Sequence, residues 1–419
     1  MKRFHKSIQS NYVVKEKLES KFKEVKELFH EITEFKDFRD SLIDDFSGFL
    51  KTMTHKLAID FEAYNPVNFF HALRLQVEED NNPRSMDELG TGEEQLLTLA
   101  FAHAYAKAFH EKILLAIEEP ECSLHPLVQD YLSKKIHNMA KEGLPVIITT
   151  HNPTFINMQN MDGICLVRKD KENGTVVTQL NRESLTAYCH QHHAPASKVR
   201  ENNIAEFYQA NSTKQIFEGF FAKKIILVEG QTETMALPIY FNALNFNLAA
   251  EGVSVIPVFG KGNLAKWWRL FTAYNIPVYV IFDNDSENDE NALKRKDILK
   301  TLGDSENQFD SLLNSAEIRV TDRYAIFGKD FETSLRSLFL QYSQFEKEAN
   351  EMFDSSAKPF ITRYVAEKLS NSECNEPGWE RLVELKDKIM DLNSTRHLDG
   401  LMKNEEDRRL YDSNDLKKQ

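Results

Sequence analysis

The sequence predicts an α/β protein with more than one domain, built on parallel sheets that are covered by helices. Hydrophobic runs of strand length alternate with helical stretches, and several of the runs end abruptly in acidic or polar residues. The length of 419 residues exceeds what a single hydrophobic core usually organises. A strand that ends in acids places them at the edge of the sheet where such folds bind ligands.

The bulk composition is that of a globular protein, with 41% hydrophobic and 28% charged residues. No apolar run approaches the length of a membrane span, and the N-terminus lacks the apolar core of a secretory signal. The four cysteines have no paired spacing, which favours a reducing compartment and argues against a disulfide frame or a zinc ribbon. We therefore expect a cytoplasmic protein with no membrane partner.

The net charge of −13 counts against a broad basic surface for nucleic acid. It does not exclude a basic groove, or a phosphate partner that binds through metal ions.

The N-terminal segment is helical in pattern. Apolar residues of 12–50 recur mostly at three- and four-residue steps with Lys and Glu between them, which predicts one long helix or two in line. The pattern fits a helix packed on its own domain and equally a helical arm or dimerisation hairpin, because periodicity does not show which surface covers the apolar stripe.

Two α/β units follow. Strand-like runs within 55–82 lead to a glycine turn that opens a helix at 88–109, and then strand, helix and strand alternate up to residue 153. A second alternation begins at Lys223, after a polar stretch. The predicted division is a helical arm (1–54), a first α/β unit (55–170), a helical linker (171–222), a second α/β unit (223–370), and a C-terminal helix with a polar tail (371–419).

The first unit contains a set of motifs suited to a nucleotide. The turn LGTGEEQ (89–95) can hold a phosphate on backbone amides at a helix N-terminus, and the strand AIEEPE (116–121) ends in two acids. The next strand ends in THNP (150–153). The residues predicted to contact nucleotide are Gly90, Thr91 and Gly92 on phosphate, Glu118 on Mg²⁺ and His151 on a γ-phosphate, with Glu119 activating water.

In this order the motifs resemble the C-terminal half of an ABC-type ATPase head of the SMC, RecF and OLD (overcoming lysogenization defect) group. LGTGEEQ resembles the signature motif, LLAIEEP the Walker B strand, SLHP the D-loop and THNP the switch histidine. The wording EEPE-x-x-LHP is most similar to OLD proteins. Glu118 stands where most ABC proteins have Asp.

The sequence contains no G-x-x-x-x-G-K-[ST] loop, and GKGN (260–263) is not one because it lacks the first glycine and the hydroxyl after Lys. We therefore expect only the second half of an ATPase site. It would belong to a truncated or degenerate form, or to a chain that binds ATP through an assembled site whose P-loop comes from a partner. ATP turnover by the purified chain alone should be negligible, and clear turnover that depends on Glu119 would contradict this.

The second unit contains an acidic constellation. Glu229, Asp283 and Asp285 follow two hydrophobic runs of strand type, in KKIILVEGQTE (223–233) and VYVIFDND (278–285). Carboxylates that converge at one sheet edge repel one another unless a cation neutralises them, and oxygen-only ligand sets suit Mg²⁺ or Mn²⁺. The pattern therefore predicts metal-dependent chemistry on phosphates.

These segments resemble the topoisomerase–primase (Toprim) domain, a Rossmann-like parallel sheet, with VFGKGN (258–263) as the glycine turn between its acidic motifs. ATPase motifs followed by Toprim motifs are the order found in OLD proteins, in the Gabija anti-phage nuclease subunit and in retron-linked effectors. The resemblance covers about residues 55–365. It implies a metal-dependent DNA endonuclease or nickase, regulated by an ATPase head and acting in anti-phage defence.

The resemblance gives meaning to further residues. Asp330 and Glu332 would hold a second metal with Asp285 or Glu233, and Lys358 would stabilise charge on a phosphate. Simpler interpretations remain open, because Glu233, Asp330 and Glu332 also suit the first turn of a helix and Lys358 also suits a plain surface position.

The resemblance also implies DNA as a partner, a homo-oligomer that is at least a dimer, and a helicase or a reverse transcriptase as a further partner. Predicted DNA contacts are Lys261, Lys266, Arg269 and the KRK run at 294–296, whereas Trp267 and Trp268 suit packing. The cluster Cys189-His190-x-His192-His193 has no second ligand pair, which favours a structural role. Two alternatives remain: a regulatory or assembly subunit, and a DNA-repair ATPase of SMC or RecF type.

Overall fold

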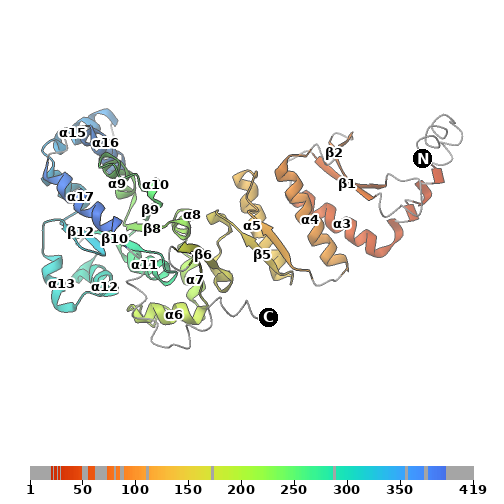
Figure 1. Ribbon diagram of the computed structural model, residues 1–419, viewed down its shortest axis with the longest axis horizontal. Coiled ribbons are helices and arrows are strands. Elements are labelled where there is room, and N and C mark those ends of the chain that lie inside the picture. The colour runs from red at the N-terminus through yellow and green to blue at the C-terminus, as the bar shows by residue number, and fades with distance from the viewer. Residues whose placement is uncertain are drawn as a thin grey trace. The chain divides into compact units, whose positions relative to one another are not determined.

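The computed structural model divides the chain into two compact units, Met1–Phe155 and Ile156–Gln419 (Figure 1). Unit 1 contains one hydrophobic core and unit 2 contains two. The structure describes residues 20–49 except 22, 26 and 29, and then 55–61, 73–79, 82–84, 89–109, 113–170, 174–285, 289–353, 357–371 and 376–392. Parts of the predicted helical arm (12–19) and polar tail (393–419) lie outside the described residues.

In unit 1 the N-terminal helical pattern is interrupted at Ile32, which is not helical. The helix α3 (Thr33–Phe49) follows it and buries Phe38, Leu42 and Phe46 against α4 (Thr91–Phe109). In the helical residues before the break, the apolar Leu28 is 62% exposed. The apolar stripe therefore packs within its own unit after residue 32 and lies on the surface before it.

Two small sheets complete unit 1. An antiparallel sheet contains β1 (His55–Phe61), β2 (Leu73–Glu79) and β3 (Asn82–Arg84). The strands β4 (Leu115–Glu118) and β5 (Val146–Thr149) pair in parallel and are connected through α5 (Pro126–Lys141), and the short η3 (Pro153–Phe155) ends the unit. Pro126 suits the first turn of α5 because that position has no intrahelical N–H partner to lose. The predicted strand–helix–strand unit is confirmed.

Unit 2 is centred on a five-stranded sheet in the order β11-β12-β10-β8-β9. The strands β8 (Lys224–Val228), β9 (Val253–Pro257), β10 (Val278–Asp283) and β12 (Tyr324–Phe327) run in parallel, and β11 (Arg319–Val320) is an antiparallel edge strand. Residues of β8 alternate between the two cores of the unit: Ile225 and Leu227 enter one, Ile226 and Val228 the other. The sheet is therefore buried on both faces, which explains its continuous hydrophobic strands and confirms the predicted α/β class with a parallel sheet.

Helices cover both faces of this sheet (Figure 1). One face carries α11 (Leu264–Ala273), with α6 (Arg182–Gln191), α7 (Ile204–Gln209), α12 (Leu293–Thr301) and α13 (Glu306–Leu313). The other carries α9 (Gln231–Ala243), with α14 (Phe331–Leu338), α15 (Tyr342–Phe353), α16 (Lys358–Ser370) and α17 (Pro377–Met390). The short helices of the unit are η4 (Met158–Gly163), α8 (Lys214–Phe217), η5 (Glu218–Phe221), α10 (Leu248–Glu251), η6 (Lys261–Asn263) and η7 (Glu290–Ala292).

The segment predicted as a helical linker is more structured than expected. A β-hairpin of β6 (Cys165–Asp170) and β7 (Gly174–Gln179) precedes the helices of this segment. The side chains Leu185, Tyr208 and Phe217 of these helices are buried in a core that also contains residues of the central sheet. The segment is polar in its overall composition, but a few large apolar side chains pack it against the rest of unit 2. In the described part of the chain, no helix is long and apolar enough to cross a membrane.

Candidate functional site

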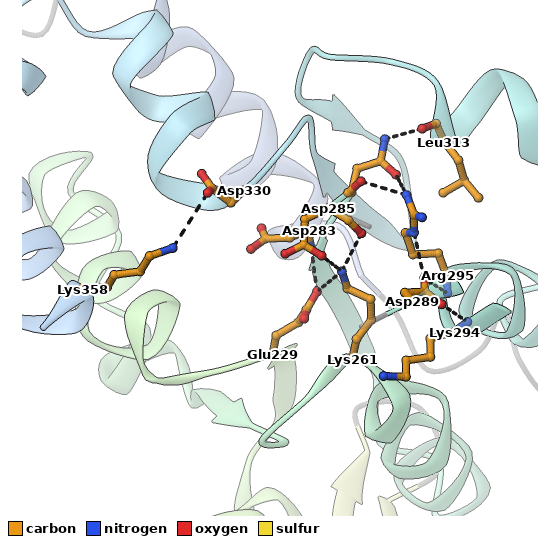
Figure 2. A network of polar contacts seen from close by, with 11 residues as sticks. Glu229, Lys261, Asp283, Asp285, Asp289, Lys294, Arg295, Leu313, Asp330 and Lys358 are labelled. Atoms are coloured by element: carbon orange, nitrogen blue, oxygen red, sulfur yellow. Dashed lines mark hydrogen bonds and ion pairs between the residues drawn. The ribbon is translucent and has the colours of Figure 1, made fainter. Parts of the chain in front are cut away.

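The acidic residues of the second unit meet at the carboxyl edge of the central sheet. Glu229 follows β8 directly and Asp283 ends β10, and these two strands are parallel neighbours. The backbone N–H of Asp283 donates to Oε1 of Glu229 at 2.8 Å, and Asp285 follows two residues later (Figure 2). The topology therefore brings together the three carboxylates that the strand ends predicted.

A fourth carboxylate joins them from the neighbouring helix. Glu233 lies in the first turn of α9 and is only 4% exposed. Burial, together with the charges of Glu229 and Glu332, raises the pKa of Glu233 to about 7. Burial and the charges of the same neighbours also raise the pKa of Asp283 well above its ordinary value. These carboxyl groups therefore form one electrostatic cluster.

This cluster suits a divalent cation. Among the described residues, Oδ1 of Asp283 is a buried polar atom without a hydrogen-bond partner. A buried carboxylate oxygen that faces other acids is costly unless a cation neutralises it, and these ligands are all oxygens. In the residues that the structure describes, however, no three His, Cys, Asp or Glu side chains stand in a ready-made metal geometry. The residue types fit Mg²⁺ or Mn²⁺, and their side chains would have to move closer to hold it.

Asp330 and Glu332 behave differently from each other. Asp330 caps α14 by accepting the N–H of Thr333 at 2.6 Å. Burial would raise the pKa of Asp330, but the hydrogen bonds from Thr333 outweigh burial and lower the pKa. Glu332 is one of the charges that raise the pKa of Asp283, and burial raises the pKa of Glu332 itself. Lys358 lies 3.9 Å from Asp330 Oδ2 and 4.0 Å from Glu332 Oε2 and is 69% exposed. Glu332 thus belongs to the acidic cluster, and Asp330 acts as a helix cap beside it.

Most of the predicted DNA contacts are corrected by the structure. Lys266 directs its Nζ to the carbonyl oxygen of Phe207, burial lowers its pKa to about 8, and Arg269 donates to the carbonyl of His192. As they stand in the structure, these basic groups are turned onto oxygens of the protein and present no basic surface to a DNA backbone, and sequence alone does not reveal burial of a basic residue. The residues concerned are each at most 7% exposed: Lys261, Lys266, Arg269 and Arg295.

Arg295 supports the acidic edge by holding the loop between Asp283 and Asp285, a role that the sequence did not show. Its guanidinium donates to both the backbone and the side-chain oxygen of Asn284 at 2.8 Å and to Asp289 at 2.8 Å (Figure 2). Asn284 lies between Asp283 and Asp285. The buried arginine therefore anchors the loop that carries both carboxylates, and only the three-dimensional contact reveals this.

Aromatic and histidine side chains of the second unit are used for packing. Trp267 and Trp268 are buried, which confirms the packing interpretation. In the Cys–His cluster, Cys189 is buried, His190 donates from Nε2 to the carbonyl of Val199 at 2.9 Å, and the ring of His192 packs against Trp268. Cys189 and His192 are therefore used in packing and His190 in a backbone contact, and both His190 and His193 are exposed.

The nucleotide motifs of unit 1 also come together. The N-terminus of α4 begins at Thr91, and a Cβ on Gly92 would lie 2.6 Å from the carbonyl oxygen of Ser123, so this glycine permits close packing against SLHP. Glu119 Oε1 lies 3.6 Å from His151 Nε2. Gly90 donates its N–H to Glu93 at 3.1 Å.

A residue that the sequence did not single out connects these motifs. Oε1 of Glu121 accepts the hydroxyl of Thr150 at 2.7 Å and the backbone N–H of His151 at 2.9 Å. Glu121 therefore joins the segment after β4 to the segment after β5. Glu118 ends β4 opposite Thr149 and is exposed.

Known proteins are similar to this chain both in the region of the acidic edge and in the region of the nucleotide motifs. Residues 220–285 match the overcoming lysogenization defect protein-like TOPRIM domain, and residues 2–156 match an AAA ATPase domain. An OLD nuclease of Thermus scotoductus is 30% identical over 240 residues, 57% of this chain and 43% of that protein. The endonuclease GajA of Bacillus cereus is 24% identical over 278 residues, 60% of this chain and 39% of that protein.

Among solved structures, the C-terminal region of the Burkholderia pseudomallei OLD protein is 26% identical, covering 43% of this chain and 88% of that one with a TM-score of 0.26. The similarity to OLD proteins is therefore taken from the sequence matches alone. The chain spans less than half of the length of the curated relatives named above. The chain therefore contains an AAA ATPase segment followed by an overcoming lysogenization defect protein-like TOPRIM domain, and it is similar to OLD nucleases over part of its length.

Proposed function

We propose that this chain hydrolyses phosphodiester bonds of DNA at the acidic edge of unit 2, as a metal-dependent endonuclease or nickase. The observation that carries the proposal is the convergence of Glu229, Glu233, Asp283 and Glu332 with raised carboxyl pKa values. Folding alone gives no reason to bury carboxylates together, whereas cation binding does. The names of the relatives, an OLD nuclease and an endonuclease, support the same chemistry.

The acids divide into two groups. Glu229, Asp283 and Asp285 would hold a first Mg²⁺ or Mn²⁺, and Glu233 with Glu332 would hold a second. Bound there, such cations supply water activation and stabilise the leaving oxygen of phosphodiester hydrolysis.

Basic side chains around the edge would orient the DNA. The exposed ammonium of Lys358, beside Glu332, is suited to contact the phosphate that is cut. Lys294, which is exposed, and Lys296, which is half-buried, are the members of the KRK run that remain candidates for the DNA backbone. Asp330 would keep Lys358 near the acidic cluster through their ion pair.

We further propose that unit 1 makes this cleavage respond to ATP. The turn at Gly90, Thr91 and Gly92, with Glu118, Glu119 and His151, would complete a nucleotide site only in an assembly of at least two chains. Such an assembly would act on DNA in the cytoplasm, in defence against phage, with a helicase or reverse transcriptase as a further partner.

The proposal is tested by nicking of supercoiled plasmid with Mg²⁺ or Mn²⁺. We expect wild-type chain to cut, EDTA to stop cutting, and Glu229→Gln to lower the rate by about 100-fold or more. Glutamine retains the oxygen that accepts the N–H of Asp283, so the fold should survive. Asp310→Asn, which changes an exposed acid of α13, serves as the matched control and should cut like wild type.

Equal cutting by wild type and Glu229→Gln would place the activity elsewhere and refute the proposed site. Absence of cutting by both, with metal and ATP present, would favour a regulatory or assembly subunit instead.

A further inference from the structure

Lys261 is a buried basic side chain that lies within the acidic edge itself, between Glu229 and Asp285. It begins η6, just after β9, and is 6% exposed. Its Nζ lies 2.7 Å from Oδ1 of Asp285, 3.3 Å from the carbonyl oxygen of Asp285, and 3.5 Å from Oε1 of Glu229 (Figure 2). A single ammonium thus bridges two carboxylates that the proposed function assigns to a metal.

The main chain holds Lys261 in this place. Gly260 has a φ of +124°, which favours glycine, and its N–H donates to the carbonyl oxygen of Glu229 at 3.0 Å. The side-chain amide of Asn263 donates to the carbonyl of Val258 at 2.9 Å, which closes the turn. The lysine is therefore anchored beside Glu229 by backbone contacts, and only its flexible side chain is free to change direction.

An ammonium and a divalent cation compete for such a position. Both are attracted to the space between Glu229 and Asp285, and they repel each other at short range. The carboxylates that the structure describes do not form a ready-made metal geometry while this ammonium is in place.

We propose that Lys261 is a positioning residue that acts as an internal counter-ion. It holds Glu229 and Asp285 together in the metal-free protein and withdraws from Asp285 when a divalent cation binds. This inference rests on the proposed metal site and adds a regulation to it. The lysine weakens the affinity of the site, so that cutting begins only at cation concentrations that displace it.

The test measures the affinity of the full chain for Mn²⁺ in the absence of DNA. The measurements are titration calorimetry and electron paramagnetic resonance of free Mn²⁺. Lys261→Met should bind Mn²⁺ about tenfold more tightly than wild type, because the competing charge is gone. Its melting temperature in EDTA should fall, because the two carboxylates lose their counter-ion. Lys261→Gln retains a donor for Asp285 and should also bind Mn²⁺ more tightly, which provides a second variant if methionine impairs folding.

Lys266→Met is the matched control. Lys266 is another buried lysine of the same segment, but its Nζ contacts the carbonyl oxygen of Phe207 and not a carboxylate. Its removal should lower stability and leave Mn²⁺ affinity unchanged.

Unchanged or weaker Mn²⁺ binding by both Lys261 variants, with clear binding by wild type, would overturn the counter-ion role while leaving the metal site intact. No Mn²⁺ binding by wild type or by either variant would overturn the metal site and this inference together.

Discussion

Replacing Asp283 with asparagine is expected to make the metal-free protein more stable while removing its metal-dependent cutting. Oδ1 of Asp283 is buried without a partner among the described residues, and burial and the charges of Glu233, Glu229 and Glu332 raise the pKa of Asp283. A carboxyl group whose pKa rises on folding destabilises the folded protein at a pH where the unfolded group is ionised. Asparagine has nearly the same shape and carries no charge, so we expect a higher melting temperature than that of wild type in EDTA at pH 7.5.

The sign of the pH dependence follows from the same shifts. Carboxyl groups whose pKa is higher in the folded state than in the unfolded state bind protons more tightly when folded. For Glu233, with a folded pKa of about 7, stability is greatest below its ordinary value near 4.5 and falls as pH rises through 7. Metal-free wild type should therefore melt at a lower temperature at pH 7.5 than at pH 5.5, and Asp283→Asn should show a smaller difference.

Melting in EDTA at these two pH values, with Asp310→Asn as the exposed-acid control, measures the effect. The same variant should lose Mn²⁺ binding and cut plasmid at least about 100-fold more slowly. A lower melting temperature for Asp283→Asn at pH 7.5 would show that the carboxylate is stabilised in the metal-free protein, against this account. In that case Asp283 would not lower the stability of the metal-free protein in exchange for metal binding.

The second large effect is expected in unit 1, where Asp45→Ala should cost about 3–5 kcal/mol. Asp45 of α3 is 7% exposed and contacts two basic side chains, His103 of α4 and Lys135 of α5. Nδ1 of His103 donates to the carboxylate, because an ionised carboxylate can only accept. Removing the acid leaves these two groups without their shared acceptor and removes a polar contact between α3 and both α4 and α5, which otherwise pack through apolar residues.

Acid should weaken this contribution. Burial opposes ionisation of Asp45, but hydrogen bonds from His103 and Lys135 outweigh it and hold the pKa of Asp45 below its ordinary value. A lowered folded pKa stabilises the protein above the unfolded pKa near 4, and the stabilisation is lost as pH falls through the folded pKa. The difference between wild type and Asp45→Ala should therefore be full at pH 7 and shrink toward pH 3.

Hydrogen exchange of peptides from α3, α4 and α5 in the full chain reports on unit 1 separately from unit 2. Asp44→Ala is a suitable control, since it removes an exposed acid from the neighbouring position of the same helix. Similar exchange in the Asp44 and Asp45 variants would show that the buried contact contributes little.

Much of the fold could be predicted because hydrophobic periodicity is a local property. The strands β8 and β10 read as continuous apolar runs because both faces of the sheet are covered, and strand–helix–strand spacing indicates parallel pairing. The hairpin of β6 and β7 was not predicted, because its short strands border a stretch of mixed, mostly polar composition.

Among the charged residues, too, some positions could be predicted from the sequence and others could not. Acids at strand ends could be predicted as candidates, because a strand end faces the ligand edge of a parallel sheet whatever surrounds it. Burial of Lys261, Lys266 and Arg295 could not, because the sequence shows a basic residue without showing what covers it. The interpretation of these lysines and arginine as DNA contacts was wrong for that reason.

By itself the sequence determined the α/β class, the order of ATPase and TOPRIM motifs, and the carboxylates Glu229, Asp283 and Asp285 as one candidate site. These depend on neighbours along the chain, which sequence records directly. Only the tertiary structure decided that Glu233 and Glu332 share that site, that Asp330 caps a helix, and that Lys261 lies among the acids. Such contacts join residues distant in the chain, and their energies depend on burial and charge in the folded molecule, which no local pattern encodes.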